Sequence, residues 1–107
     1  MTALALLEAG RRRLSGPERW TTRTFARNAK GREVSRCSQE ACAWCVAGAL
    51  GPSDGDPYFE ALEALVDALP AGPWGREPAQ FNDATGTTFA DVAALYDRAI
   101  AKLRGTL

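Results

Sequence analysis

The segment Trp44-Cys45-Val46-Ala47-Gly48-Ala49-Leu50 decides our expectation for the fold. It is apolar and built mostly of small side chains, which allow neighbouring elements to approach closely. Ser38 precedes it, and serine is a common helix N-cap. Gly51-Pro52 follows it, and proline cannot continue a helix. The sequence therefore predicts a helix over residues 39–50, at the centre of a small core.

Three further helices are expected around this segment. The first runs from residue 2 to about residue 14, where Ser15-Gly16-Pro17 stops it. The second starts at Asp56-Pro57, with the aspartate as N-cap and the proline at the first helical position. The last opens at Thr88, where Asp91 three residues later resembles a capping box.

The helix that starts at Asp56 has an amphipathic pattern. Phe59, Leu62, Val66 and Leu69 recur at spacings of three and four residues, while the acidic side chains fall mostly between them. This periodicity is typical of a helix that covers a core with one face. We expect these four side chains to be buried.

A short hairpin completes the predicted architecture. Residues 20–27 are rich in threonine and aromatic side chains, residues 28–31 form an Asn/Gly turn, and residues 32–34 return. The predicted fold class is mostly α (α+β): about four helices packed around the central helix 39–50, with a short β-hairpin near 20–35. Residues 1–107 are expected to form one small globular domain.

Composition and charge restrict the possible partners. The 107 residues carry a formal net charge of zero, which argues against general binding to nucleic acid or to a membrane surface. The apolar N-terminus is short and runs into Glu8 and three arginines, unlike a signal peptide, so we expect a cytoplasmic protein. Nine of the basic residues nevertheless fall within residues 1–36, against three glutamates. The oligomeric state stays open.

Three cysteines, at positions 37, 42 and 45, invite a chemical interpretation. Cys42 and Cys45 form a C-x-x-C unit, but a redox pair normally starts a helix after a strand, a pattern absent here. A structural zinc site needs four ligands, and the chain has three cysteines and no histidine. We therefore interpret Cys42 and Cys45 as small buried hydrophobes, and we expect neither a metal nor a cofactor.

The absence of histidine also restricts catalysis. Cys-His and Ser-His nucleophiles, and histidine acid–base chemistry, are excluded within one chain. A carboxylate pair would require convergence in space, and a chain this small has little room for a deep cleft. These points favour a protein that is not an enzyme, with no assigned catalytic residues.

Asn82-Asp83 is the most interesting polar pair in the sequence. Two short polar side chains between Phe81 and a glycine turn can bind a ligand, but asparagine and aspartate more often hold turns through backbone amides. Other candidate binding residues are Trp74, expected in an exposed loop, and Arg23 and Arg27 on the hairpin. An arginine–aromatic patch of this kind suits a partner protein or a nucleic-acid backbone.

Two dense blocks carry a family resemblance: Trp44-Cys45-x-x-Gly48-Ala49-Leu50 and Phe81-Asn82-Asp83-Ala84-x-Gly86-x-Thr88-x-x-Asp91-Val92. Trp20-Thr21 and the stretch from Leu95 to Ile100 add to these two blocks. With them, the chain is similar to a family of small bacterial and phage proteins of unknown function. The resemblance implies a stand-alone domain, without an established activity or cofactor, and transfers no catalytic residue.

Three functional hypotheses follow. The first is a small protein-interaction module, carried by a phage or mobile element, that binds or inhibits a host protein. The second is a ligand-binding domain or enzyme with its site at Asn82-Asp83, and finding Cys45 within reach of that pair beside a cleft would favour it. The third and weakest is nucleic-acid binding by the basic hairpin. The sequence favours the first.

Overall fold

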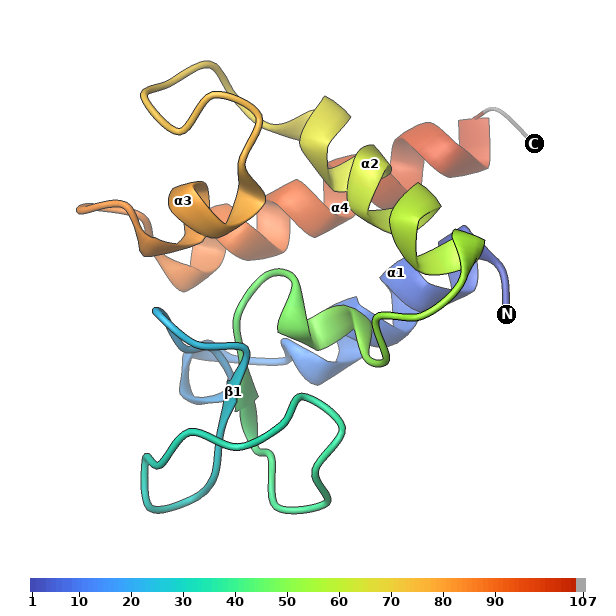
Figure 1. Ribbon diagram of the computed structural model, residues 1–107. Coiled ribbons are helices and arrows are strands. Elements are labelled where there is room, and N and C mark those ends of the chain that lie inside the picture. The colour runs from blue at the N-terminus through green and yellow to red at the C-terminus, as the bar shows by residue number, and fades with distance from the viewer. Residues whose placement is uncertain (106–107) are drawn as a thin grey trace.

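Three helices surround the hydrophobic core in the computed structural model, which describes residues 1–105. They are α1 (Ala3–Arg13), α2 (Asp56–Ala68) and α4 (Phe89–Gly105), and each packs against the other two (Figure 1). All three begin within a residue or two of the predicted positions, and α1 also ends there. Thr106 and Leu107, the last residues of the predicted domain, lie outside the described residues.

The ends of α1 and α4 show why local sequence sufficed for these helices. The Thr2 hydroxyl accepts a hydrogen bond from the Ala5 amide at 3.0 Å at the start of α1. At the start of α4, the Thr88 amide donates to Asp91 Oδ2 at 2.9 Å, and the Asp91 amide donates to the Thr88 hydroxyl at 3.3 Å. This reciprocal pair is the predicted capping box, and it satisfies amides that the helix itself leaves free.

The predicted central helix 39–50 is wrong. The segment contains strand β2 (Ala43–Trp44) and the short 3-10 helix η2 (Gly48–Leu50) instead. Ser38 does not cap a helix, because its hydroxyl accepts from the Glu40 amide and its carbonyl from the Ala41 amide in a turn. The segment is nevertheless central, since residues 45–51 are all buried and η2 packs on α1.

The strand partner of residues 26–27 differs from the one expected. The turn at Asn28–Gly31 forms as predicted, with one β-bridge between Arg27 and Glu33. The regular antiparallel ladder, however, joins β1 (Ala26–Arg27) to β2, beyond the predicted hairpin. Trp20 forms a further bridge to Trp44, so β2 lies between two segments that precede it in sequence.

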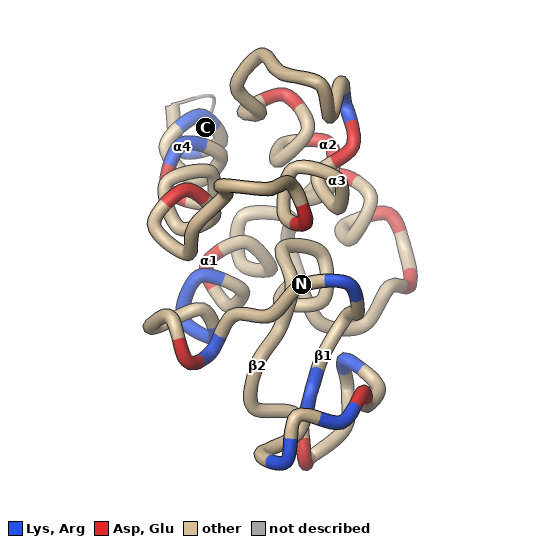
Figure 2. Tube along the Cα trace, turned by 90° about the vertical axis from the view of Figure 1, so that its left-hand side faces the viewer, with Lys and Arg blue, Asp and Glu red and all other residues tan. Residues whose placement is uncertain are grey.

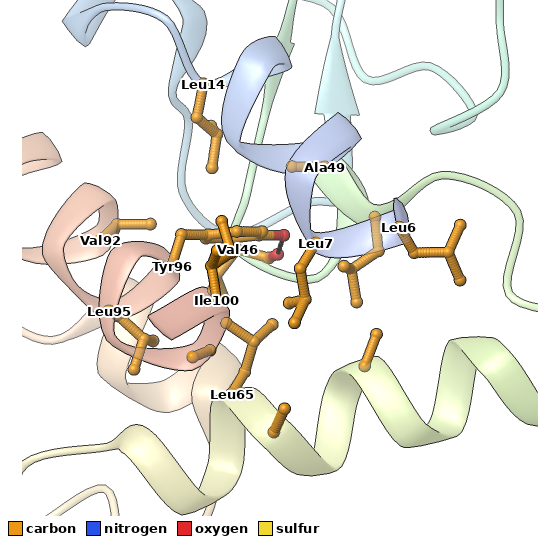
Figure 3. Close-up of a cluster of buried hydrophobic side chains, with 14 of the residues drawn as sticks. Leu6, Leu7, Leu14, Val46, Ala49, Leu65, Val92, Leu95, Tyr96 and Ile100 are labelled. Carbon is orange, nitrogen blue, oxygen red and sulfur yellow. Dashed lines mark hydrogen bonds between the residues drawn. The ribbon is translucent and has the colours of Figure 1, made fainter. Parts of the chain in front are cut away.

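Tyr96 ties the helices to the central segment. It is fully buried, and its hydroxyl donates to the Val46 carbonyl at 2.6 Å; Figure 3 shows the phenol directed at Val46 among leucines from α1, α2 and α4. Gly10 of α1 makes this packing possible, because an added Cβ there would meet Tyr96 Cε1 at 2.7 Å.

The buried face of α2 also differs from the prediction. Of the four predicted side chains, Leu62, Val66 and Leu69 are half-buried and Phe59 is 59% exposed. The fully buried residues of α2 are Tyr58, Ala61, Ala64 and Leu65. The alanines let α2 approach the neighbouring helices closely, so the buried face is not the one with the largest apolar side chains. The predicted class is confirmed: residues 1–105 hold four α-helices, counting the short α3 (Pro78–Asp83), and one two-stranded sheet.

Candidate functional site

A pocket with a cavity volume of about 400 Å³ lies where α3 meets the extended segment before β1. Both predicted polar residues belong to it, and they come from the end of α3 rather than from the expected turn. Pro78 at the first helical position is the sequence signal that predicts this helix. The lining residues are Arg23, Thr24, Phe25, Cys45, Ala79, Asn82 and Asp83.

Asn82 holds the back of the pocket together. It is only 1% exposed, and its Oδ1 accepts from Trp20 Nε1 at 2.7 Å and from the Val46 amide at 3.0 Å. Its Nδ2 donates to the Thr21 carbonyl at 3.1 Å and to Asp83 Oδ1 at 2.9 Å. Both acceptor sites and both donors of the amide are therefore used. Asn82 positions the walls of the pocket and has no hydrogen-bonding capacity left for a ligand.

Asp83 fixes the backbone on the opposite wall. Its Oδ1 accepts from the Arg23 amide at 2.9 Å, in addition to the bond from Asn82. Arg23 has a φ of 69°, the one positive value among the non-glycine residues that the structure describes. A left-handed backbone costs an L-residue with a bulky side chain roughly 1–2 kcal/mol. The hydrogen bond to Asp83 helps to hold Arg23 in this costly conformation.

Cys45 also lines this pocket. The residue is 5% exposed, and its Sγ accepts from the Gly48 amide at 3.3 Å. Desolvation by burial raises the pKa of this thiol, and the nearby Asp83 charge acts in the same direction. A raised pKa keeps the sulfur protonated and weakly nucleophilic. Cys45 thus contributes an apolar surface, in agreement with the interpretation of this residue as packing material.

Phe25 forms an aromatic wall of the pocket, held from one side. Its ring is 51% exposed, and the Arg36 guanidinium carbon lies 3.9 Å from the ring centroid. Arg36 also donates to the Tyr58 hydroxyl at 3.0 Å, which ties it to α2. This cation–π contact fixes the orientation of a ring that would otherwise be free to rotate in solvent.

A family model described as a family of unknown function (DUF6197) matches residues 1–102. The chain belongs to this family. No curated protein and no solved structure matches it. The family supplies no activity to test against the pocket, so the chemistry of this member must come from its own residues.

The other predicted candidates lie elsewhere in this family member. The Trp74 ring packs edge-on against Phe81 at 4.9 Å and its Nε1 donates to the Pro70 carbonyl, so the side chain is half-buried rather than fully exposed. The Arg27 guanidinium is turned inward, where it donates to the Thr21 hydroxyl at 2.8 Å and to nearby carbonyls. Neither residue lines the pocket, whereas Arg23 does.

The remaining cysteines differ in exposure. Cys37 is exposed and Cys42 is half-buried, and both are free thiols like Cys45. Within residues 1–105, no three cysteine, aspartate or glutamate side chains are grouped so as to hold a metal ion. In the same part of the chain, none of the helices has the length and apolar character needed to cross a membrane.

Basic and acidic residues are both spread over the molecule, and the basic residues do not form one continuous surface. Figure 2 shows basic residues along β1 and the loops next to it, and on α1 and the end of α4, with acidic residues interspersed. Several arginines are paired: Arg11 with Asp97, Arg104 with Glu8, and Arg76 with Glu63 and Asp67.

The sequence did not predict that Thr24, Phe25 and Ala79 belong to the candidate site. Thr24 and Ala79 carry no motif, and Phe25 was expected only as an aromatic residue of the hairpin. No signal in the sequence marks Arg23 for a left-handed backbone, because glycine and asparagine are the residues that favour it. The pocket arises from the meeting of residues 23–25 with α3, which are more than fifty positions apart.

Proposed function

We propose that this protein binds a small organic ligand in the pocket between Arg23 and Asp83, and that it is a binding domain rather than an enzyme. The observation that carries the proposal is the backbone of Arg23, kept in a left-handed conformation by Asp83 at the wall of a partly apolar pocket. Strained residues concentrate at functional sites, because the surrounding structure must hold them there. The Asn82 network provides that rigid support.

The position of Cys45 supports the same proposal. Cys45 lines the same cavity as Asn82 and Asp83, and this arrangement favours the ligand-binding hypothesis over the interaction module. The size also fits, since ligand pockets range from roughly 300 to 1,000 Å³. A pocket at the lower end of this range takes a ligand of few atoms.

Binding is favoured over catalysis by the chemistry of the lining. The candidate nucleophile, Cys45, has a raised pKa, and the sequence offers no histidine to deprotonate it. Asp83 Oδ1 is occupied by two N–H donors, so this oxygen is committed to holding the pocket. The lining therefore offers apolar and charged surfaces for binding a ligand, but no evident base or nucleophile.

The proposal is tested by a fragment screen followed by ¹H–¹⁵N spectroscopy on the whole chain. Ligands should shift the amide signals of Thr24, Cys45 and Ala79. Ala79→Trp should abolish these shifts, because the indole would fill the pocket from an exposed position on α3. Gln80→Trp is the matched control, since Gln80 is the next exposed residue and does not line the pocket. If no fragment shifts these amides, or if Ala79→Trp binds as well as the parent chain, the pocket is not the functional site.

A second candidate function is the protein-interaction module predicted from the sequence. The observation that favours it is Phe59, which is 59% exposed on α2 beside a shallow cleft with an acidic rim that includes Asp56 and Glu60. Exposed aromatic side chains are common anchors at protein interfaces. Capture of a partner from cell extract that survives Ala79→Trp but is lost on Phe59→Ala would favour this function.

A further inference from the structure

We infer that the ligand is a small zwitterion of the amino-acid class with an apolar side chain, its ammonium group held by Asp83 and its carboxylate by Arg23. This inference rests on the proposed function and deepens it. Two charges of opposite sign line one pocket of about 400 Å³, and they do not form an ion pair with each other in the part of the chain that the structure describes.

The carboxylate of Asp83 has one oxygen available. Oδ1 accepts from the Arg23 amide and from Asn82 Nδ2, and these two bonds fix the plane of the carboxylate. Asp83 is an exposed residue, and among residues 1–105 no protein donor forms a hydrogen bond to Oδ2. A carboxylate oxygen that is oriented but unpaired is a good acceptor for an ammonium group, because the cost of fixing its side chain has already been met by the fold.

The side chain of Arg23 is available for the opposite charge. It is exposed, and within the described chain its guanidinium makes no hydrogen bond or ion pair. Arg11 and Arg104 have carboxylate partners, whereas Arg12 and Arg32 have no such partner in the described chain; Arg23 differs from these two because it lines the pocket with Asp83. The guanidinium group has the planar fork that matches a carboxylate in two parallel hydrogen bonds. A left-handed backbone also sets the direction in which the long side chain leaves the wall of the pocket.

The rest of the lining selects the apolar part of the ligand. The Phe25 ring, the Ala79 methyl group and the Cys45 thiol are apolar surfaces within the same cavity. The Phe25 ring is held in place by Arg36, so it offers a fixed face. The cavity is at the small end of the range for ligand sites, which suits a single amino acid better than a nucleotide.

Four matched probes test the inference on the unmodified chain: L-leucine, N-acetyl-L-leucine, L-leucinamide and N-acetyl-L-leucinamide. The second lacks the ammonium charge, the third lacks the carboxylate charge, and the fourth lacks both. Titration followed by the amide signals of Thr24 and Cys45 should give the lowest Kd for leucine. Each masked charge should raise the Kd roughly tenfold, the effect expected for one charge-assisted contact.

Two variants, Asp83→Asn and Arg23→Gln, assign each charge to a side chain, and Arg23→Lys serves as the charge-conserving control. Asp83→Asn retains Oδ1 as an acceptor, so it should keep the pocket while losing the preference for a free ammonium group. Arg23→Gln should lose the preference for a free carboxylate, and Arg23→Lys should retain most of it. Asp83→Asn and Arg23→Gln should each raise the Kd of leucine about tenfold and leave the Kd of the probe that already lacks the matching charge unchanged, whereas Arg23→Lys should bind leucine nearly as well as the parent chain.

The outcomes separate the two proposals. Equal affinity for all four probes would overturn the zwitterion inference and leave the binding function standing, because the pocket would then recognise apolar groups alone. No binding of these probes, with binding of uncharged fragments in the same pocket, would also overturn only the inference. Failure of every fragment and probe to shift the pocket amides would overturn the proposed function as well.

Discussion

Replacing Asn82 with alanine should destabilise the protein more than any other single change of a polar side chain. The amide of Asn82 connects three segments: Trp20-Thr21 before β1, the Val46 amide after β2, and Asp83 at the end of α3. Alanine removes every one of these bonds and supplies no donor or acceptor in their place. The two-residue strands make few bonds of their own, so this region depends on Asn82.

The magnitude follows from what each partner loses. The Val46 amide is buried, and leaving a buried donor unsatisfied costs about 1–3 kcal/mol. Trp20 Nε1 and the Thr21 carbonyl are half-buried, so water can replace part of their bonds, at about 1 kcal/mol each. Asn82→Ala should therefore lower the free energy of unfolding by about 3–5 kcal/mol, a large share of the roughly 5–15 kcal/mol typical of a domain.

Urea unfolding followed by far-ultraviolet circular dichroism measures this change, because the helices report global unfolding. Asn28→Ala is the matched control. Asn28 Oδ1 also accepts two hydrogen bonds, from the amides of Lys30 and Arg32, but in an accessible turn. Its loss should cost about 1 kcal/mol or less. If the two variants were equally stable, burial of the Asn82 network would not be what stabilises this region.

Four other predictions concern the packing and the pocket. Gly48→Ala should lower the free energy of unfolding by about 2–4 kcal/mol in the same urea assay, because its Cβ would lie 2.0 Å from the Phe25 carbonyl oxygen. Burial raises the pKa of Tyr96 well above 10.0, so its stabilising effect is fully present below pH 10 and is lost as the pH rises from there; Tyr96→Phe should show less loss of stability in alkaline melts. Cys45 should resist a thiol reagent until the chain unfolds, as peptide mass spectrometry will show. Arg23→Gly should raise the melting temperature, with a gain of about 1 kcal/mol from the relieved backbone, while leucine binding falls.

The parts of the fold that were predicted correctly are the parts governed by neighbouring residues. The start of α4 follows from Thr88 and Asp91, whose side chains bond to amides three residues away. The start of α2 follows from Pro57, which fits the first turn of a helix and few other regular positions. Such signals lie within one turn of the element they specify, so a single sequence contains all the information needed.

The segment over residues 39–50 shows the opposite case. Its small and apolar side chains permit a helix, but the backbone amides find better acceptors far away in sequence. The Cys45 amide donates to the Phe25 carbonyl at 3.1 Å, and the Val46 amide donates to Asn82. Gly48 is needed for close contact with the Phe25 backbone, not for helix packing. Tertiary hydrogen bonds therefore override a weak local preference, and no pattern within the segment announces them.

The candidate site was predictable in part from residue type and in part only from contacts between distant segments. Asn82-Asp83 stood out in the sequence as a polar pair, yet its ordinary explanation, a turn, applies to neither residue. The Asn82 amide bonds to Thr21 and Val46, which are 61 and 36 residues away, and Asp83 bonds to the Arg23 amide 60 residues away. Spacing along the chain cannot show such contacts. Residue type alone showed that the pair needed an explanation, and only the fold could provide it.

Asn82 and Asp83 have different roles in the proposed ligand pocket, which shows how so small a domain can form one. All hydrogen-bonding groups of the Asn82 amide are used within the protein and hold the back wall of the pocket. Asp83 uses Oδ1 to accept from the Arg23 amide and from Asn82, while its Oδ2 accepts no hydrogen bond from the described residues. Arg23, which lines the same pocket, keeps a left-handed backbone at a cost of roughly 1–2 kcal/mol. A purely structural turn at this position would be better served by glycine, which adopts the same backbone without strain. Arginine at this position is therefore a feature that stability does not explain and that the proposed ligand recognition does explain.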